Sequence, residues 1–263
     1  MSFTVKKENG KLIFNDDGGY ETRNPATIWC IKEADKIYKW NDFKQLTIHT
    51  DDQEINDDCY SYSKQSSYNK LVPDFHFCNW PEVGIIDYNE TIKSIHLSGL
   101  NQPEINKVGW IGCFTNSTRR RLFEIGNLNK DLFEIHHMDW IRNNPKLLKG
   151  TQYISTPDLV KKYSILIDAG AGGYSGRVKH LLWSHRPLLL VDRTHKEYFY
   201  EYLIEWEHYI PVKSDLSDLI EKTQWCLTNY ESAKTIAENA YNFSKKYLTR
   251  EACYEQWNKI LKN

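Results

Sequence analysis

Short runs of alternating hydrophobic and polar residues dominate the first half of the chain. Their length and their β-branched and aromatic content predict strands at 26–32, 45–50, 74–80 and 107–114. Turn-rich polar stretches such as DDQEINDDC separate these runs. The pattern over 84–106 favours neither a strand nor a helix. We therefore expect an N-terminal unit built from short strands and loops.

The second half alternates more regularly between helical and strand patterns. Strands are predicted at 132–137, 163–169 and 187–192, and helices at 118–127, 157–163, 176–184, 196–204, 216–228 and 231–247. A last helix is expected after Thr249, whose hydroxyl suits an N-cap. Strands that alternate with helices along the chain indicate a parallel α/β layer. The boundary between the two halves is expected near residues 105–115.

Composition narrows the class of protein. The 263 residues carry 34 Lys and Arg against 35 Asp and Glu, a formal net charge of −1, so we expect no nucleic-acid partner. No apolar run approaches the ~18–20 residues of a membrane span, and the first residues lack the apolar stretch of a signal peptide. A cytoplasmic protein is therefore expected. Aromatic residues make up 14% of the chain, and such rings either fill a core or stack on sugars and bases.

The strongest local signal is a glycine-rich turn in the segment YSILIDAGAGGYSGRVKHLLWSHRPLLLVD. A buried strand leads into Gly170, Gly172 and Gly173, and a helix is predicted to begin near Arg177. Glycines let the backbone approach a ligand closely, and a helix N-terminus presents unpaired N–H groups. An arginine at that end opposes the helix dipole unless an anion is bound. The turn therefore predicts a site for a phosphate or a diphosphate.

Two classes of enzyme have such a turn. In a dinucleotide or S-adenosylmethionine enzyme, Asp192 at the end of the next strand would hold a ribose hydroxyl. In a two-domain glycosyltransferase, the turn would bind a nucleotide sugar. An enzyme of the first class usually opens its sheet with this turn, whereas here a separate unit precedes it and almost wholly helical sequence follows Asp192. This order favours the glycosyltransferase and leaves the first class as the alternative.

Longer stretches resemble glycosyltransferase family 90, the Rumi-like protein O-glucosyltransferases with a CAP10-type domain. The likeness is densest over about 160–257, which includes GYSGRVKHLL, EYFY, HYIPVKSDLSDL and AENAYNF. Upstream, CYSYSK (59–64) and GWIGCFTNSTRRRLF (109–123) are similar to two further segments of the family. The resemblance implies an α/β fold of the GT-B type, with two Rossmann-like halves that face a cleft. It also implies inverting transfer of a sugar, most often glucose or xylose, from a UDP-sugar donor to a glycan or protein acceptor, without a metal or other cofactor.

The resemblance implies a catalytic base as well. An inverting transfer needs one carboxylate to take the proton of the acceptor hydroxyl while its oxygen attacks the anomeric carbon. In the family this is an aspartate at a strand end shortly before the segment that CYSYSK resembles. Asp52 in LTIHTDDQ matches it best, and Asp51 is the alternative.

The donor side would be held by residues on both sides of the glycine-rich turn. Arg177 is the first candidate for the diphosphate and Arg120 the second, with Arg119 as the alternative register. The other candidates for donor binding are Thr115, Gly172, Gly173, the main-chain N–H of Ser175, and Glu197. One departure stands out, because Gly112 occupies a position where the family has an arginine. That departure favours a further alternative, a family member that binds sugar nucleotides without turnover.

A metal site is not expected. His136 and His137 are adjacent on a predicted strand, so they point to opposite faces and make a poor ligand set with Asp139. The chain also has no Asp-x-Asp triplet. The predicted organisation is an N-terminal acceptor-side half (1–108), a donor half (109–247) and a C-terminal helix (248–263) that packs back across both.

Overall fold

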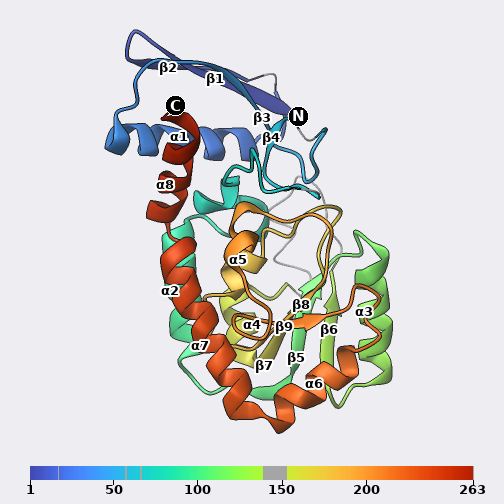
Figure 1. The fold of residues 1–263 in the computed structure, drawn as a ribbon. Coiled ribbons are helices and arrows are strands. Elements are labelled where there is room, and N and C mark those ends of the chain that lie inside the picture. Colours follow the sequence, from blue (N-terminus) through green and yellow to red (C-terminus); the bar gives the residue numbers. More distant parts are fainter. Residues whose placement is uncertain (17, 57, 66, 139–152, 263) are drawn as a thin grey trace.

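The computed structural model describes residues 1–263 except 17, 57, 66, 139–152 and 263. It contains two sheets that lie one above the other in Figure 1, a four-stranded one built from the first residues and a five-stranded one built from the second half. Helices α2 (Tyr88–Gly99), α4 (Thr156–Lys162), α5 (Val178–Leu181) and α7 (Tyr230–Tyr247) lie on one side of the larger sheet, and α3 (Ser117–Leu128) lies on the other. The predicted α/β class, with a parallel sheet in the second half, is confirmed.

The N-terminal sheet has the order β2-β1-β3-β4, formed by β1 (Ser2–Glu8), β2 (Lys11–Asp16), β3 (Phe43–His49) and β4 (Tyr60–Ser61). Asn9 and Gly10 both have positive φ and form a two-residue hairpin loop that makes β1 and β2 antiparallel. Strand β1 is also antiparallel to β3, whereas β3 and β4 are parallel. This half therefore departs from the expected Rossmann-like pattern, because a hairpin replaces a strand–helix–strand crossover.

Residues 26–32, which were predicted to be a strand, lie in helix α1 (Arg23–Tyr38), so this prediction is wrong. Ala26, Cys30 and Ala34 are buried and recur every four residues, which is the period of a helix face. The run looks like a strand because its seven residues are mostly apolar. Only the longer window with its polar flanks distinguishes a one-sided helix from a buried strand.

The C-terminal sheet is parallel throughout and has the order β6-β5-β7-β8-β9. Its strands are β5 (Ile105–Gly112), β6 (Phe133–His137), β7 (Tyr163–Asp168), β8 (Leu188–Val191) and β9 (Ile210–Val212). The strands predicted at 107–114, 132–137, 163–169 and 187–192 are confirmed; β9 was not predicted. Every residue of β7 and β8 is buried, as expected for strands covered on both faces.

Most predicted helices of the second half are present. They are α3 (Ser117–Leu128), α4 (Thr156–Lys162), α5 (Val178–Leu181), α6 (Leu219–Thr228), α7 (Tyr230–Tyr247) and α8 (Arg250–Leu261). Two segments form short 3-10 helices: 74–80, predicted as a strand, contains Phe75–Phe77, and 196–204, predicted as a helix, contains Tyr198–Tyr202. Helix α2 (Tyr88–Gly99) lies in the stretch whose pattern was ambiguous and packs against α4. Among the described residues, no helix is long and apolar enough to span a bilayer.

The C-terminal helix connects the two units. Thr249 caps α8 by accepting a hydrogen bond from the main-chain N–H of Ala252 at 3.0 Å, as predicted. Helix α7 runs along the larger unit, and α8 then continues to α1 of the smaller one (Figure 1). The indole N–H of Trp40, just after α1, donates to Asn258 at 2.8 Å, and Trp257 is fully buried. The chain end therefore packs on both units.

A buried ion cluster also joins the units. The ammonium of Lys179 in α5 lies 2.9 Å from a carboxylate oxygen of Asp74 and 2.7 Å from one of Glu197. Asp74 belongs to the loop that leads from the N-terminal sheet, and its carboxylate also pairs with His76. All four side chains are buried. Burial and the nearby carboxylate of Asp74 raise the pKa of Glu197 to about 8, although Lys179 opposes this.

Replacing Lys179 with methionine tests whether the cluster holds the units together. The variant leaves Asp74 and Glu197 buried without their cation, and we expect a loss of about 3–5 kcal/mol in the free energy of unfolding. Urea titration followed by circular dichroism measures it. Lys259→Met is the matched control, because Lys259 is exposed and its ion pair with Glu255, at 3.5 Å, lies at the surface, so its loss should stay below about 0.5 kcal/mol. Equal losses in the two variants would contradict the assignment.

Candidate functional site

The carboxyl ends of β5 and β7 form the edge where the order of the sheet reverses. In an open parallel sheet, ligands bind outside the strand ends at such a switch point. The loop after β5 and the glycine-rich turn after β7 meet there, because the Asn116 side chain caps α3 and donates to the carbonyl of Ala171 at 2.8 Å. The predicted turn therefore lies where a parallel sheet places its ligand.

Three arginines converge on this turn. Arg119 donates from Nε to the carbonyl of Gly170 at 2.5 Å, and Arg177 donates to the carbonyl of Ile111 at 2.6 Å. Arg193, just after β8, forms an ion pair with Asp168 at 2.6 Å. Two of the three guanidinium groups therefore bind neutral carbonyl oxygens and keep their charge unmatched by these contacts.

Asp168 is the carboxylate that all three arginines share. It is buried at the end of β7, accepts a hydrogen bond from the Ser175 hydroxyl at 2.8 Å, and lies close to all three guanidinium groups. Burial alone would raise its pKa, but Arg193, Arg177 and Arg119 together lower it. Burial and the neighbouring Arg177 lower the pKa of Arg119 to about 10. One carboxylate therefore faces three cations, and the turn carries excess positive charge.

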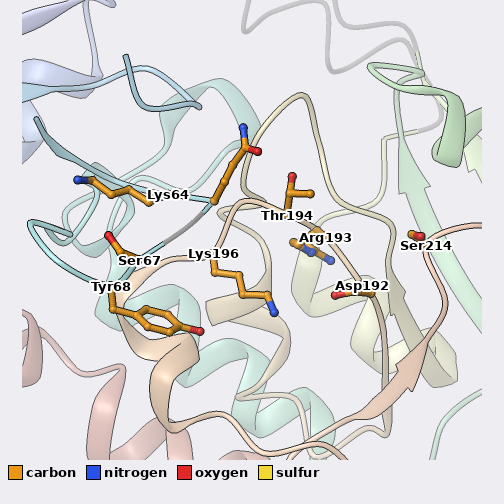
Figure 2. Close-up of a pocket in the computed structure, with 9 residues that line it drawn as sticks. Lys64, Ser67, Tyr68, Asp192, Arg193, Thr194, Lys196 and Ser214 are labelled. Atoms are coloured by element: carbon orange, nitrogen blue, oxygen red, sulfur yellow. The ribbon is translucent and has the colours of Figure 1, made fainter. Parts of the chain in front are cut away.

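Two hollows open at the tips of the strands. The smaller, of about 160 Å³, is lined by residues 169–173 of the glycine-rich turn, by Asn116 and Thr118 of α3, and by residues 191–195; we call it the switch-point hollow. The larger, of about 460 Å³, lies between the N-terminal unit and the loops after β8 and β9 (Figure 2); we call it the outer hollow. Its lining residues are Lys64, Gln65, Ser67, Tyr68, Asp192, Arg193, Thr194, Lys196 and Ser214. The hollows share Asp192, Arg193 and Thr194, so they are contiguous.

Asp52 lies directly against the glycine-rich turn. Its carbonyl oxygen accepts hydrogen bonds from the main-chain N–H of Tyr174 at 3.3 Å and from the Ser63 hydroxyl at 2.9 Å. Its carboxylate is 42% exposed and pairs with Arg23 at 2.8 Å. Asp51, the alternative, pairs instead with the amino group of Met1. The fold thus brings Asp52 to the turn although more than a hundred residues separate them in the sequence.

The remaining residues predicted to bind the donor differ in exposure and in their contacts. Gly172 is exposed in the switch-point hollow, and Gly173 is buried against Asp52. Thr115 is exposed at the tip of the loop after β5, and Ser175 is buried through its bond to Asp168. Arg177 precedes a helix of only four residues, so its neighbouring arginines, more than a helix dipole, account for the positive charge of the site.

Two predicted donor residues lie apart from the other candidates. Arg120 is exposed on α3 with its guanidinium 5.2 Å from the ring centre of Phe114, whereas Arg119, the alternative register, reaches the turn. Glu197 is 1% exposed and engaged by Lys179, so in this structure its carboxylate faces the buried cluster.

The histidines of β6 have partners that are not metals. His136 bonds to the Tyr163 hydroxyl at 2.9 Å and to Glu134 at 3.1 Å. His137 stacks on Phe114 with ring centres 3.9 Å apart. Asp139, which the sequence analysis considered as a third metal ligand, lies outside the described residues. Within the described part of the chain, no cluster of His, Cys, Asp or Glu side chains could hold a metal ion.

Sequence reasoning missed four residues of this site and its surroundings. Arg193 and the Arg23 partner of Asp52 lie in stretches without a recognisable motif, so no local signal identified them. Lys179 lies inside the GYSGRVKHLL segment, but its partner Asp74 is distant in sequence. Asn116 could have been identified, because an Asn three residues before an arginine-rich helical run suits an N-cap.

The contact between Asp52 and the turn leads to a test on two neighbouring glycines. A methyl group added at Gly173 would lie 2.0 Å from the carbonyl oxygen of Asp52, whereas one added at Gly172 would meet nothing within 4 Å. We therefore expect Gly173→Ala to lower the free energy of unfolding by about 1–3 kcal/mol and Gly172→Ala to change it by less than about 0.5 kcal/mol. Thermal and urea unfolding measure both. Equal effects would mean that the two units do not meet at this point.

Comparison with known proteins gives the family. A family model described as glycosyl transferase family 90 matches residues 38–263. Protein O-glucosyltransferase 2 of Danio rerio is 29% identical over 169 residues, which cover 63% of this chain and 33% of that protein. Protein O-glucosyltransferase 1 of Homo sapiens is 35% identical over 102 residues, which cover 38% of this chain and 26% of that protein.

Among solved structures, the crystal structure of TarM covers 62% of this chain and 37% of its own, with a TM-score of 0.46 and 16% sequence identity. The chain spans a third or less of the length of these two curated relatives. The family match, in contrast, covers most of the chain and includes Asp52, the glycine-rich turn and all three arginines around it. The chain therefore belongs to glycosyltransferase family 90.

Proposed function

We propose that the protein transfers a sugar, glucose or xylose, from a UDP-sugar to an acceptor hydroxyl of a glycan or protein, with inversion at the anomeric carbon and without a metal. The observation that carries this proposal is the excess positive charge at the switch point, where Arg119, Arg177 and Arg193 share Asp168. A UDP-sugar has two negative charges on its diphosphate. Binding it there would neutralise the two cations that Asp168 leaves unmatched.

The reaction we propose is a single displacement. The carboxylate of Asp52 takes the proton of the acceptor hydroxyl while the oxygen bonds to the anomeric carbon. The bond between that carbon and the diphosphate oxygen breaks, and UDP leaves with the electron pair. Arginine N–H groups stabilise the charge that develops on the departing diphosphate, which is the largest contribution that a preorganised site usually makes.

The glycine at position 112 does not argue strongly against donor binding. A side chain there would lie 2.7 Å from the Trp110 ring, so the space of the expected arginine is filled by the indole. Arg119 and Arg193 bring positive charge to the same strand ends from other elements. The alternative of a family member without turnover rests on Gly112, and the activity of purified protein decides it.

The charge of the site also weighs against the S-adenosylmethionine alternative. That cosubstrate carries a sulfonium cation and no phosphate, so three arginines would repel it. A dinucleotide has a diphosphate and would suit the same charge. Thermal-shift measurements with UDP, UDP-glucose, UDP-xylose, NAD and S-adenosylmethionine separate these ligands, and stabilisation by S-adenosylmethionine alone would overturn the proposal.

The role of Asp52 is tested by its amide variant. Asp52→Asn keeps a hydrogen-bonding group beside Arg23 but cannot take a proton, and we expect transfer to fall by about 10²–10⁴-fold while the dissociation constant for UDP changes less than twofold. Radiolabelled transfer assays and calorimetry measure the two quantities. Asp51→Asn is the matched control and should retain transfer. The reverse result, with Asp51→Asn inactive, would assign the base to Asp51.

The role of Arg177 is tested on UDP affinity. Arg177→Ala removes a charge-assisted bond to the diphosphate, and we expect UDP binding to weaken by about 1–3 kcal/mol. Arg121→Ala is the control, because Arg121 is an exposed arginine on α3. Calorimetric titration with UDP measures both variants. An unchanged affinity in Arg177→Ala would move the diphosphate away from this turn.

A further inference from the structure

The outer hollow is a second opening at the cleft that the proposed chemistry does not use. Its N-terminal wall is formed by Lys64, Gln65, Ser67 and Tyr68, and its other wall by the loops after β8 and β9. Its volume of about 460 Å³ lies within the range of sites that hold small ligands. Figure 2 shows Tyr68, Lys196 and Asp192 around the opening, with the ring of Tyr68 on the N-terminal side.

The two walls are fixed to each other by main-chain hydrogen bonds and by a side-chain contact between His195 and Glu54. Lys64 and Lys196 exchange main-chain hydrogen bonds of 3.1 Å and 2.9 Å. His195 pairs with Glu54 at 3.0 Å, and Glu54 also accepts the main-chain N–H of Gln65 at 3.0 Å. The hollow is therefore formed before any ligand enters, which lowers the entropic cost of binding.

The lining has the chemistry of a site for hydroxyl-rich ligands. Asp192 and Thr194 are exposed, Lys196 is half-buried, and Ser214 is exposed at the tip of β9. Together they offer a carboxylate, an ammonium and two hydroxyls, which can each accept from or donate to sugar hydroxyls. The ring of Tyr68 is 40% exposed and adds one flat apolar face. Directional polar groups beside a single ring suit a pyranose, which has hydroxyls at its rim and C–H groups on its faces.

We propose that the outer hollow is the acceptor subsite and that it binds a sugar unit of a glycan acceptor, with Tyr68 stacked on the ring. This inference rests on the proposed function, because the hollow continues the switch-point hollow through Asp192, Arg193 and Thr194, where the donor would lie. A glycan is favoured over a folded protein domain because stable protein contacts bury about 800 Å² on each partner and centre on apolar anchors. The opening offers one ring and is otherwise polar.

The test measures glycan binding and UDP binding on the same protein. Fluorescently labelled protein in saturating UDP is applied to an array of immobilised oligosaccharides that end in glucose, xylose or N-acetylglucosamine, and UDP affinity is measured by calorimetry. We expect binding to at least one glycan class, weakened at least tenfold in Tyr68→Ala, with UDP affinity unchanged. Tyr68→Trp and Tyr68→Phe keep a ring and should stay within threefold of the unmodified protein.

Tyr230→Ala is the matched control, because Tyr230 is also 40% exposed but lies at the start of α7, at the far end of the larger unit (Figure 1). Glycan binding that Tyr68→Ala does not weaken would overturn the inference, as would binding of a serine-bearing protein domain with no glycan. UDP affinity that falls in Tyr68→Ala would assign the hollow to the uridine and also overturn it. No glycan binding with normal UDP binding overturns this inference alone, whereas no UDP binding overturns the proposed function.

Discussion

The ammonium of Lys179 lies between a carboxylate from each unit of the protein, with no exposed surface of its own. Separating the units would break the ion pairs of Lys179. A buried charge that loses its partner costs several kcal/mol in the free energy of unfolding. The cluster also includes Glu197, which directly follows Lys196 in the wall of the outer hollow. The position of the 192–197 loop and the distance between the units are therefore set by the same contacts. The two units are therefore joined by buried charge as well as by apolar packing.

The chemistry of the site follows from the order of the strands. Because β5 and β7 are neighbours at the switch point, the loop after β5, the turn after β7 and the loop after β8 reach one place. The start of α3, the turn after β7 and the loop after β8 each bring one arginine, and Asp168 is a carboxylate that interacts with all three. A site of this kind is costly for the fold, since like charges repel in a medium of low dielectric constant. A bound anion would recover this cost, and this is the basis on which we propose a diphosphate ligand.

The second half of the fold could be predicted from the sequence, and the first half could be predicted only in part. Strands such as β7 and β8 are fully buried, so their composition alone separates them from their neighbours. Residues 26–32 of helix α1 were predicted as a strand because this short run is mostly apolar and contains few charged residues. The β1–β2 hairpin was overlooked even though Asn9-Gly10 is a strong hairpin signal. Within the site, the sequence could not distinguish Arg119 from Arg120. Adjacent residues of a helix point about 100° apart, and only packing shows which of the two faces the turn.

The sequence by itself determined the family, the glycine-rich turn and the candidate carboxylate, because these depend on residues that are close together in the chain. Only the tertiary structure decided that Asp52 contacts Gly173, that Arg119 and not Arg120 reaches the turn, and that Glu197 faces Lys179. It also divided the aromatic residues: Phe75 and Phe77 fill the core, whereas Tyr68 remains partly exposed in the lining of a polar hollow. The physical reason is that charge balance and burial depend on the sum of contacts from distant segments, which no local pattern of residues contains.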